Sequence, residues 1–384
     1  MRDQRSTNMP MNRRTFLKAM LATAAVSGCG DPELVIEYDP TTAPLKMPGY
    51  YGLAELPFFE LRKGRLVNVV PNFPKAIDFH GHLGFVVGDL ARTPADLTVR
   101  NTMKYLIDCD GHEDCHMDME VYLNQIASQE MLDDSESALL TGAMTGKGPI
   151  VHHTVPNYVA ELDEMKFDTS LLLPIKLNLV QPDDMEDNWR NAVTACKADK
   201  RFHFFGSVHP AQEGWREALQ QYKADGVKGI KFHPTMQRLA PDSDEGMAII
   251  EECDRLGLHV FFHAGKAGIE PGTGHFANME NYDLPLNEFP NTTFIFGHSG
   301  ARDWEEALVR GQNHSNIVME FAGPSIQTMK AMLEAVGPDR LVFGSDWPFY
   351  PLAATLAKVL HITWEDEITR DKILEHNARR LLDL

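Results

Sequence analysis

The chain has 384 residues, of which 43% are hydrophobic and 24% are charged. This is an ordinary globular composition with enough apolar material for a sizeable core. The formal net charge is −19, and no long basic run follows residue 18. Because phosphate binding needs a basic surface, nucleic acid is excluded as an expected partner, and a small molecule is the expected ligand.

Residues 1–29 are typical of an export signal. Twin arginines at positions 13 and 14 precede Phe16-Leu17-Lys18 and an apolar run over 19–26. That run is shorter than the about 20 apolar residues that span a bilayer, and the arginine pair indicates twin-arginine export. Val26-Ser27-Gly28-Cys29 resembles a bacterial lipobox, although an ordinary signal with a chance cysteine is the alternative. We therefore expect a periplasmic or outer-membrane lipoprotein, with a lipid anchor as its only contact with the membrane.

Residues 30–70 are expected to form a tether and a small hairpin. Asp31 to Leu56 is rich in Pro and Thr and shows little periodicity, which predicts a tether. Two short runs around Lys63-Gly64, within 58–67, predict a hairpin that precedes the main domain.

Over residues 71–384, short apolar runs alternate with amphipathic stretches such as Trp215–Ala224, Met247–Leu256 and Trp304–Arg310. Continuous apolar runs are typical of parallel strands buried on both faces. Eight such units predict an α/β fold, a (β/α)₈ TIM barrel, closed by a helix over Ile368–Leu382. The expected strands are Ile77–Phe79, Leu171–Ile175, Phe202–Val208, Gly229–Phe232, Val260–Phe262, Phe294–Phe296, Ile317–Phe321 and Leu341–Phe343.

The connection after the first strand, residues 84–168, is far longer than an ordinary crossover. It contains helical patterns at Met117–Ser128 and Val155–Leu162. Because it leaves the carboxyl end of a strand, we expect a large insertion over the mouth of the barrel, as a lid or substrate wall. His152 and His153 lie within it and could reach the pocket.

A cysteine-rich segment, 109–116, lies in the same insertion and is dense in potential metal ligands. Three interpretations stay open: a disulfide between Cys109 and Cys115, a solvated acidic loop, or a second metal site. Export favours the disulfide. Cys196 and Cys253 are expected to be separate buried residues on helices.

Imidazole, carboxylate and amine groups stand at the ends of five expected strands. The carboxyl ends of barrel strands meet at one face, so these side chains should converge although they are far apart in the sequence. Unrelated core histidines are the weaker alternative. The residues are His80 and His82 after the first strand, Lys231 and His233 after the fourth, His263 after the fifth, His298 after the sixth, and Asp346 after the eighth.

The segments around these residues resemble the amidohydrolase superfamily. Gly-Ile-Lys-Phe-His-Pro at 229–234, His-Ser-Gly-Ala at 298–301 and Gly-Ser-Asp-Trp-Pro at 344–348 are similar to its amidohydrolase-related branch, also named amidohydrolase 2. The resemblance covers about Ala76 to the C-terminus, including a final helix over 374–382. That branch includes hydrolases and non-oxidative decarboxylases of aromatic and muconate-type acids.

The resemblance implies one divalent metal. Zinc is expected first, with manganese or iron as alternatives, and the implied ligands are His80, His82, His263 and Asp346. His298 matches the catalytic histidine of the family. Asp346, beside the metal and its water, would also accept a proton.

Four further residues are candidates for substrate binding. Lys231 stands where some members of the superfamily carry a carbamylated lysine between two metals. In the single-metal branch it is unmodified, and it either faces a negative charge on the substrate or packs as structure. Arg302 could clamp a carboxylate or pair with a nearby acidic residue, His233 could line the mouth, and Trp347 could form a pocket wall.

The sequence therefore predicts an exported metal-dependent hydrolase that activates water against a small molecule. A decarboxylase or hydratase of an aromatic or unsaturated carboxylic acid is the alternative. A non-catalytic binding lipoprotein is a remote third possibility. A protein without activity would be free to lose metal ligands, whereas the ligand set in this sequence is complete. The sequence leaves open whether the chain forms a homodimer.

Overall fold

The computed structural model describes residues 38–83, 103–135, 137, 152–174, 193–266 and 272–384. By its internal contacts the chain divides into Met1–Glu37 and Tyr38–Leu384, so every described residue belongs to the second unit. The predicted export signal and Cys29 lie outside the described residues. Within the described part, no helix is both long and apolar enough for a membrane span.

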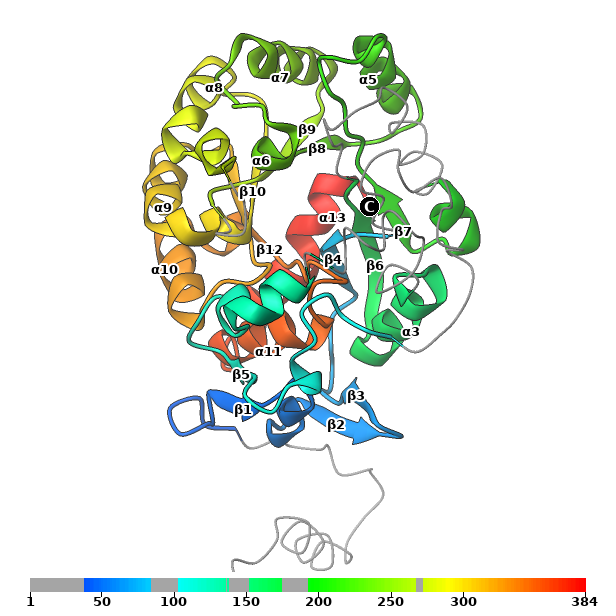
Figure 1. Ribbon diagram of the computed structural model, residues 1–384, viewed down its shortest axis with the longest axis vertical. Coiled ribbons are helices and arrows are strands. Elements are labelled where there is room, and N and C mark those ends of the chain that lie inside the picture. Colours follow the sequence, from blue (N-terminus) through cyan, green and yellow to red (C-terminus); the bar gives the residue numbers. More distant parts are fainter. Residues whose placement is uncertain (1–37, 84–102, 136, 138–151, 175–192, 267–271) are drawn as a thin grey trace, which may run out of the picture. The chain divides into compact units, whose positions relative to one another are not determined.

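Within the described residues, eight parallel strands form the predicted barrel (Figure 1). They belong to two hydrogen-bonded sheets, β4-β6-β7 and β8-β9-β10-β11-β12. Bridges between Gly206 and Ile230 and between Gly81 and Trp347 join the sheets at two seams. The strands are β4 (Ala76–Gly81), β6 (Phe167–Leu172), β7 (Phe202–Phe204), β8 (Gly229–Phe232), β9 (His259–His263), β10 (Phe294–Gly297), β11 (Ile317–Glu320) and β12 (Leu341–Val342).

The inside of the barrel is a packed apolar core. Each strand except β8 contributes one or two side chains to this core, either from the strand itself or from the residue directly after it. The C-terminal helix α13 (Asn377–Leu382) contributes three more. His259 and Leu341, at the starts of their strands, hydrogen-bond to Leu381 and Asn377 of α13. The helix therefore closes the amino end of the barrel and leaves the carboxyl end for the site. The core residues are Ile77, Phe79, Leu171, Leu173, Phe205, Phe261, Ile295, Val318, Val342, Ala378, Leu381 and Leu382.

Helices ring the strands, as the amphipathic stretches predict (Figure 1). Ser243 and Ser325 cap α7 and α10, each accepting a hydrogen bond from a backbone N–H in the first turn. The predicted closing helix is divided into α12 (Glu367–Asp371), a π-helical turn and α13. The other main helices are α3 (Val155–Met165), α5 (Trp215–Ala224), α6 (Pro234–Gln237), α7 (Asp244–Leu256), α8 (Asp283–Glu288), α9 (Trp304–Asn313), α10 (Ile326–Val336) and α11 (Leu352–Ile362).

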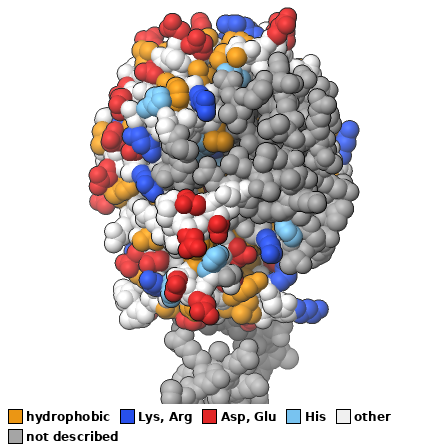
Figure 2. Space-filling view, in the orientation of Figure 1, with side chains coloured by type: hydrophobic (Ala, Val, Ile, Leu, Met, Phe, Trp, Pro, Cys, Tyr) orange, Lys and Arg blue, Asp and Glu red, His pale blue; other side chains and the backbone are white. Residues whose placement is uncertain are grey.

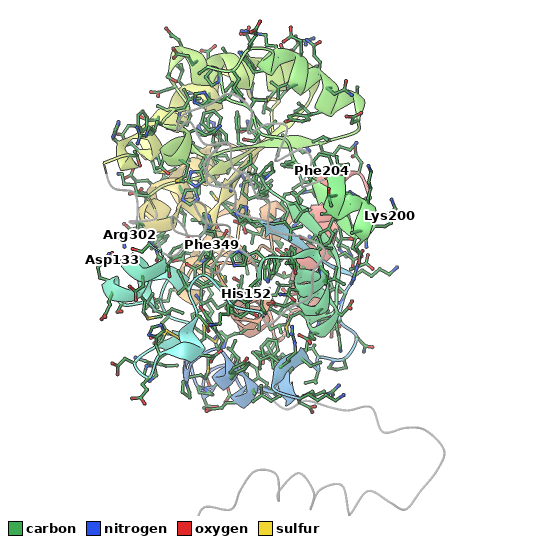
Figure 3. The ribbon with its side chains drawn as sticks, turned by 45° about the vertical axis from the view of Figure 1, so that its right-hand side comes forward. Asp133, His152, Lys200, Phe204, Arg302 and Phe349 are labelled. Carbon is green, nitrogen blue, oxygen red and sulfur yellow. A yellow bond between two sulfur atoms is a disulfide. The ribbon has the colours of Figure 1, made fainter. Side chains whose placement is uncertain are left out.

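Helix α3 corrects the predicted extent of the insertion. It immediately precedes β6 and packs against β6 and α11, so it is a crossover helix of the barrel and not part of a cover. The insertion therefore ends before Val155. His152, close to the start of α3, lies in the middle of the molecule in Figure 3.

The other helix predicted in the insertion, Met117–Ser128, is not formed. The structure has strand β5 (His116–Asp118) and a short 3-10 turn, η3 (Leu123–Gln125), in its place. Met117 and Met119 are both fully buried, with a less buried residue between them. Burial of every second residue is the period of a strand, so the prediction of a helix over this segment is wrong.

The predicted tether is also shorter than expected. Within it, β1 (Lys46–Pro48) pairs antiparallel with β5, and η1 (Tyr51–Glu55) follows. Tyr50 is buried and donates a hydrogen bond to the Ile107 carbonyl over 2.8 Å. Residues 38–56 therefore pack on the domain. The predicted hairpin is confirmed as β2 (Phe59–Arg62) and β3 (Arg65–Asn68).

Cys109 and Cys115 form a disulfide, which decides between the three interpretations of that segment. His112 and His116 beside it are exposed. Cys253 is buried and unpaired on α7, as predicted, and Cys196 is unpaired and only partly buried.

Acidic side chains are spread over the described part of the surface in Figure 2, which agrees with the net charge of −19. Basic side chains are interspersed among them in the described part of this face.

Candidate metal centre and active site

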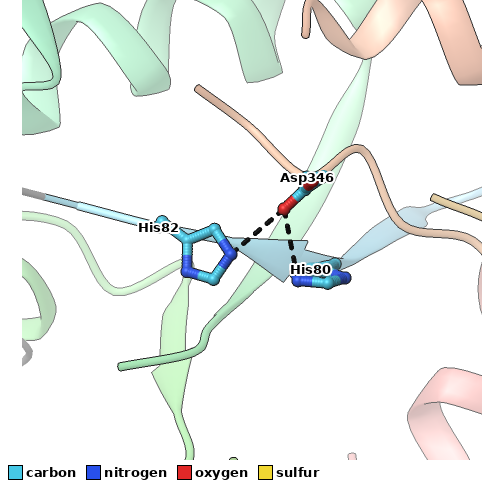
Figure 4. A group of neighbouring side chains, drawn as sticks. All are labelled: His80, His82 and Asp346. Atoms are coloured by element: carbon cyan, nitrogen blue, oxygen red, sulfur yellow. Dashed lines mark hydrogen bonds and ion pairs between the residues drawn. The ribbon is translucent and has the colours of Figure 1, made fainter. Parts of the chain in front are cut away.

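His80, His82 and Asp346 meet at the carboxyl ends of β4 and β12 (Figure 4). His82 Nε2 lies 3.1 Å and His80 Nε2 lies 3.3 Å from the same oxygen, Asp346 Oδ1. All three residues are buried, and their candidate ligand atoms lie within 4.8 Å of one another. Two imidazole nitrogens that face one carboxylate oxygen are a donor set suited to a divalent cation.

A buried carboxylate behind this group fixes the two strand ends. Asp78 accepts hydrogen bonds from the Tyr158 hydroxyl over 2.6 Å and from the Ser345 backbone N–H over 2.9 Å. Burial raises the pKa of Asp78 to about 6, against the effect of these hydrogen bonds. Asp346 has a positive φ of 60°, and its N–H donates to the His80 carbonyl. The position of the Asp346 carboxylate is therefore set by backbone as well as side-chain contacts.

The remaining nitrogens of the two histidines determine which way each ring presents its lone pair. His82 Nδ1 lies 2.6 Å from the Leu173 carbonyl, which only accepts, so this nitrogen carries the proton. Lys231 Nζ lies 3.2 Å from His80 Nε2 and can only donate, so the proton of His80 is on Nδ1. Nε2 therefore carries the lone pair in both rings. That of His80 accepts from Lys231, and both nitrogens lie beside Asp346 Oδ1, where a cation would bind them.

His263, at the end of β9, extends the group. Its ring stacks on His233 at a centroid distance of 4.1 Å and lies 4.5 Å from the ring of His298. His263 Nε2 is buried and has no hydrogen-bond partner. A buried polar atom without a partner is costly, and a bound cation would satisfy it. The orphaned nitrogen and the donor set together fit a divalent metal.

Burial keeps these imidazoles neutral. It lowers the pKa of His80 and of His263 well below the usual value, and Lys231 adds to the effect on both. It lowers the pKa of His298 to about 4, although Asp346 opposes the shift. At neutral pH the rings are therefore in the form that binds metals or accepts a proton.

Lys231 is a buried amine inside the group. Its Nζ lies 4.4 Å from the centroid of the Phe261 ring. Burial lowers the pKa of Lys231 to about 8, and Asp346 and Glu320 act in the opposite direction. The ammonium is therefore held beside the candidate ligands and faces their negative charge.

Two predicted substrate-binding residues are placed differently. Arg302 is exposed and lies at the edge of the molecule in Figure 3, where it lines a cavity of about 460 Å³ together with Tyr122 and Thr328. Trp347 is fully buried, stacks on Tyr158 at 4.1 Å, and donates to Glu161 over 3.0 Å. These contacts are those of a residue that supports the site from behind.

Glu320 lies near the site and was not in the predicted set, whereas His153 was named as an insertion residue that could reach the pocket. Glu320 is the last residue of β11, the seventh strand of the barrel, so the strand-end argument that selected the histidines would also have found it. His153 is fully buried, and neither of its ring nitrogens meets the geometry of a hydrogen bond, although the Lys104 backbone lies near. Burial lowers the pKa of His153 to about 3. Its ring lies 6.0 Å from that of Trp347.

The family profile described as Amidohydrolase matches residues 107–384, about three quarters of the chain. The chain belongs to this amidohydrolase family. It is a metal-dependent enzyme of the amidohydrolase 2 branch, whose members include hydrolases and decarboxylases. The predicted family is therefore confirmed. No curated protein matches the chain.

Solved structures share the fold of this amidohydrolase. A 5-carboxyvanillate decarboxylase from Sphingomonas paucimobilis is 15% identical, with a TM-score of 0.57 over 81% of this chain and 99% of that chain. A probable 2-pyrone-4,6-dicarboxylic acid hydrolase from Acinetobacter baumannii, with citric acid bound, is 15% identical, with a TM-score of 0.51 over 81% and 100%. A 5-carboxyvanillate decarboxylase from Novosphingobium aromaticivorans, with manganese and 4-hydroxy-3-methoxy-5-nitrobenzoic acid, is 16% identical, with a TM-score of 0.50 over 68% and 90%. At these identities the likeness establishes the barrel fold alone.

Proposed function

We propose that this amidohydrolase is an exported hydrolase of a small molecule. The observation that carries the proposal is the buried group of His80, His82 and Asp346, with the unpartnered Nε2 of His263 near it. These four residues would hold one divalent cation, zinc first and manganese as the alternative. When bound, such a cation lowers the pKa of a water molecule and polarises a substrate oxygen.

The protein residues then handle the proton. Asp346 presents its carboxylate to the middle of the group, where it can accept a proton from the attacking water. His298 lies beside it, with Nδ1 held by the Ala322 carbonyl over 2.9 Å. Its other nitrogen, which is neutral at pH 7 because of burial, can accept that proton and pass it to the leaving group.

Decarboxylation of an aromatic acid is the second candidate, and Lys231 is the observation that favours it. An ammonium 3.2 Å from a candidate metal ligand would attract a substrate carboxylate. Within the described residues, however, Lys231 is the one cation with a contact to the group, while Arg302 is exposed and lines a cavity together with Tyr122. A site that binds carboxylate substrates would be expected to contain several cationic side chains. We therefore favour hydrolysis over decarboxylation.

Metal analysis combined with a substrate screen tests the proposal. The purified protein should carry about one divalent cation per chain. It should release acid from lactones or esters in a pH-indicator assay, or release amine from amides. Release of CO₂ from aromatic acids, without hydrolysis of any of these, would establish the second candidate. A protein that binds no divalent cation would overturn both.

A further inference from the structure

We infer that Glu320 is the positioning residue that holds the candidate metal ligand His80 and the candidate catalytic residue His298 in register. The inference rests on the proposed function, because it needs a cation at His80. It assigns a role to a residue that lies outside the proposed ligand set.

One oxygen of Glu320 makes both contacts. Oε2 lies 3.2 Å from His80 Nδ1 and accepts a hydrogen bond from the backbone N–H of His298 over 2.8 Å. Glu320 is fully buried at the end of β11. The same carboxylate oxygen therefore ties β4 to the turn that follows β10.

On the His80 side, the contact orients the ligand. Because Lys231 donates to Nε2, the Nδ1–H of His80 points at Glu320, and Nε2 keeps the lone pair that a cation would take. A carboxylate that accepts from the outer nitrogen of a histidine fixes its tautomer and ring orientation and raises its basicity as a ligand. Loss of this acceptor should therefore weaken cation binding while all four ligands stay in place.

On the His298 side, the contact fixes an unusual backbone. His298 and Ser299 have φ values of 59° and 50°, in the left-handed region that non-glycine residues seldom occupy. The Ser299 hydroxyl also donates to the Glu320 carbonyl over 2.9 Å. Glu320 thus holds this turn, and with it the ring of His298, through both its side chain and its backbone.

By distance alone, His80, His298 and Glu320 could hold a cation of their own. However, Oε2 already receives two N–H groups, and one of them is a backbone amide that cannot be displaced by rotation of a side chain. Gly344 leaves the space for Oε1, because a Cβ at that position would collide with this oxygen and with His80 Cβ. Oε1 is buried and has no hydrogen-bond partner, so the positioning role rests on Oε2, which is occupied by two N–H donors.

Glu320→Gln tests the inference with Mn²⁺ and Zn²⁺ as probes. The amide keeps the shape of the side chain but puts an NH₂ donor in place of one carboxyl oxygen, so the Kd of each cation should rise about 10- to 100-fold. Chelator competition at pH 7.5 measures the Kd, and elemental analysis at saturation should still give one cation per chain. Glu320→Asp, which retracts the carboxylate, should also weaken binding.

Glu161→Gln is the matched control. Glu161 is an equally buried carboxylate that accepts from Trp347 and from the Leu352 N–H, and it does not touch the candidate ligands. Its variant should bind both cations as tightly as the wild type. If Glu320→Gln does so too, the positioning role is wrong while the metal site stands.

Other outcomes separate the two proposals. A wild type that binds no cation overturns the proposed function. Two cations in the wild type and one in Glu320→Gln would make Glu320 a ligand and reject the positioning role. If both Glu320 variants fail to fold while Glu161→Gln folds, as judged by circular dichroism, Glu320 is a structural residue and the inference is rejected.

Discussion

At the scale of single residues, the candidate site consists of imidazoles around one carboxylate, and burial lowers the pKa of His80, His263 and His298 so that these rings are neutral. Neutral rings can be ligands or bases, and the contacts of each ring separate these roles. His80 and His82 face Asp346 with Nε2, whereas His298 is held by the Ala322 carbonyl and the carboxylate of Glu320. Loss of a ligand and loss of His298 should therefore have different consequences.

We predict that His263→Ala and His298→Asn differ in metal content. His263→Ala removes a proposed ligand, so the metal content should fall well below that of the wild type, and activity should fall with it. His298→Asn leaves four proposed ligands, so the metal content should stay near that of the wild type. Its activity should still drop, because a positioned acid–base group commonly supplies about 10²–10⁴-fold. Elemental analysis of the two variants is the measurement. If the wild type holds two cations and His298→Asn loses one, the single-metal assignment is wrong.

A second prediction at this scale concerns pH and Glu161. Burial raises the pKa of Glu161 from its ordinary value of 4.5 to about 7 in the folded protein. Between these two values the folded state binds more protons than the unfolded state, so this group's contribution to stability is complete below pH 4.5 and is lost as the pH rises through 7. In Glu161→Gln the decrease in the free energy of unfolding from pH 5 to pH 8 should be smaller than in the wild type. Urea unfolding at both pH values measures it, and an equal or steeper decrease would contradict the assignment.

The strand-end residues were predictable because two local signals coincide at each of them. An apolar run marks a strand, and a polar residue directly after it marks the open face of the barrel. Glu320 carries the same signal as Lys231, because each is a polar residue next to the last residue of an apolar run. His153 does not follow an expected strand, and it reaches the neighbourhood of Trp347 through the tertiary fold.

At the scale of elements, the segment over 103–135 is attached to the barrel by a buried lysine. Lys358 on α11 donates to the Val121, Gly323 and Pro324 carbonyls over 2.8, 3.2 and 2.9 Å. The Leu123 N–H also donates to the Gly323 carbonyl. These contacts hold Tyr122 with its ring 6.3 Å from that of His298. One side chain of the outer ring thus secures the wall beside the candidate catalytic histidine.

Lys358→Met should loosen this segment. The change removes the lysine donor from three carbonyl groups, of which that of Gly323 keeps the Leu123 N–H. A buried polar group left unpaired costs about 1–3 kcal/mol. We expect a lower free energy of unfolding and faster limited proteolysis within 103–135. Lys330→Met, at an exposed position of α10, is the control and should behave as the wild type. First cleavage within 200–350 in the Lys358 variant would speak against the attachment.

The strands of the barrel could be predicted from the sequence more accurately than the elements around the barrel. A strand buried on both faces must be apolar along its whole length, so its pattern hardly depends on context. Met117–Ser128 and Asp31–Leu56 lack such a rule, because β1 and β5 are short and each is defined only by pairing with the other. Helix α3 was recognised as a helix, but its place in the outer ring depends on contacts with β6 and α11, which local periodicity does not encode.

At the scale of the whole molecule, the evidence for the enzyme and the evidence for export come from different parts of the chain. The described domain, Tyr38–Leu384, contains the barrel, the disulfide and the candidate site. The disulfide between Cys109 and Cys115 agrees with an oxidising compartment, since such bonds are rare in the cytosol. Export and lipid attachment are proposals that depend on residues 1–29.

The final prediction is that Cys29 is the site of lipid attachment. The run Val26-Ser27-Gly28-Cys29 follows a short apolar segment, which is the order that a lipoprotein signal requires. One acyl chain binds a membrane only weakly, so stable attachment would need more than one chain on the processed cysteine. Cells given a fatty-acid probe should label the wild type and leave Cys29→Ser unlabelled, and the variant should be released from the membrane fraction. Cys196→Ser controls for labelling of a partly buried thiol and should label as the wild type does. Equal labelling of the wild type and Cys29→Ser, or none of either, would reject the anchor while leaving the proposed metal site untouched, because the proposed ligands begin at His80.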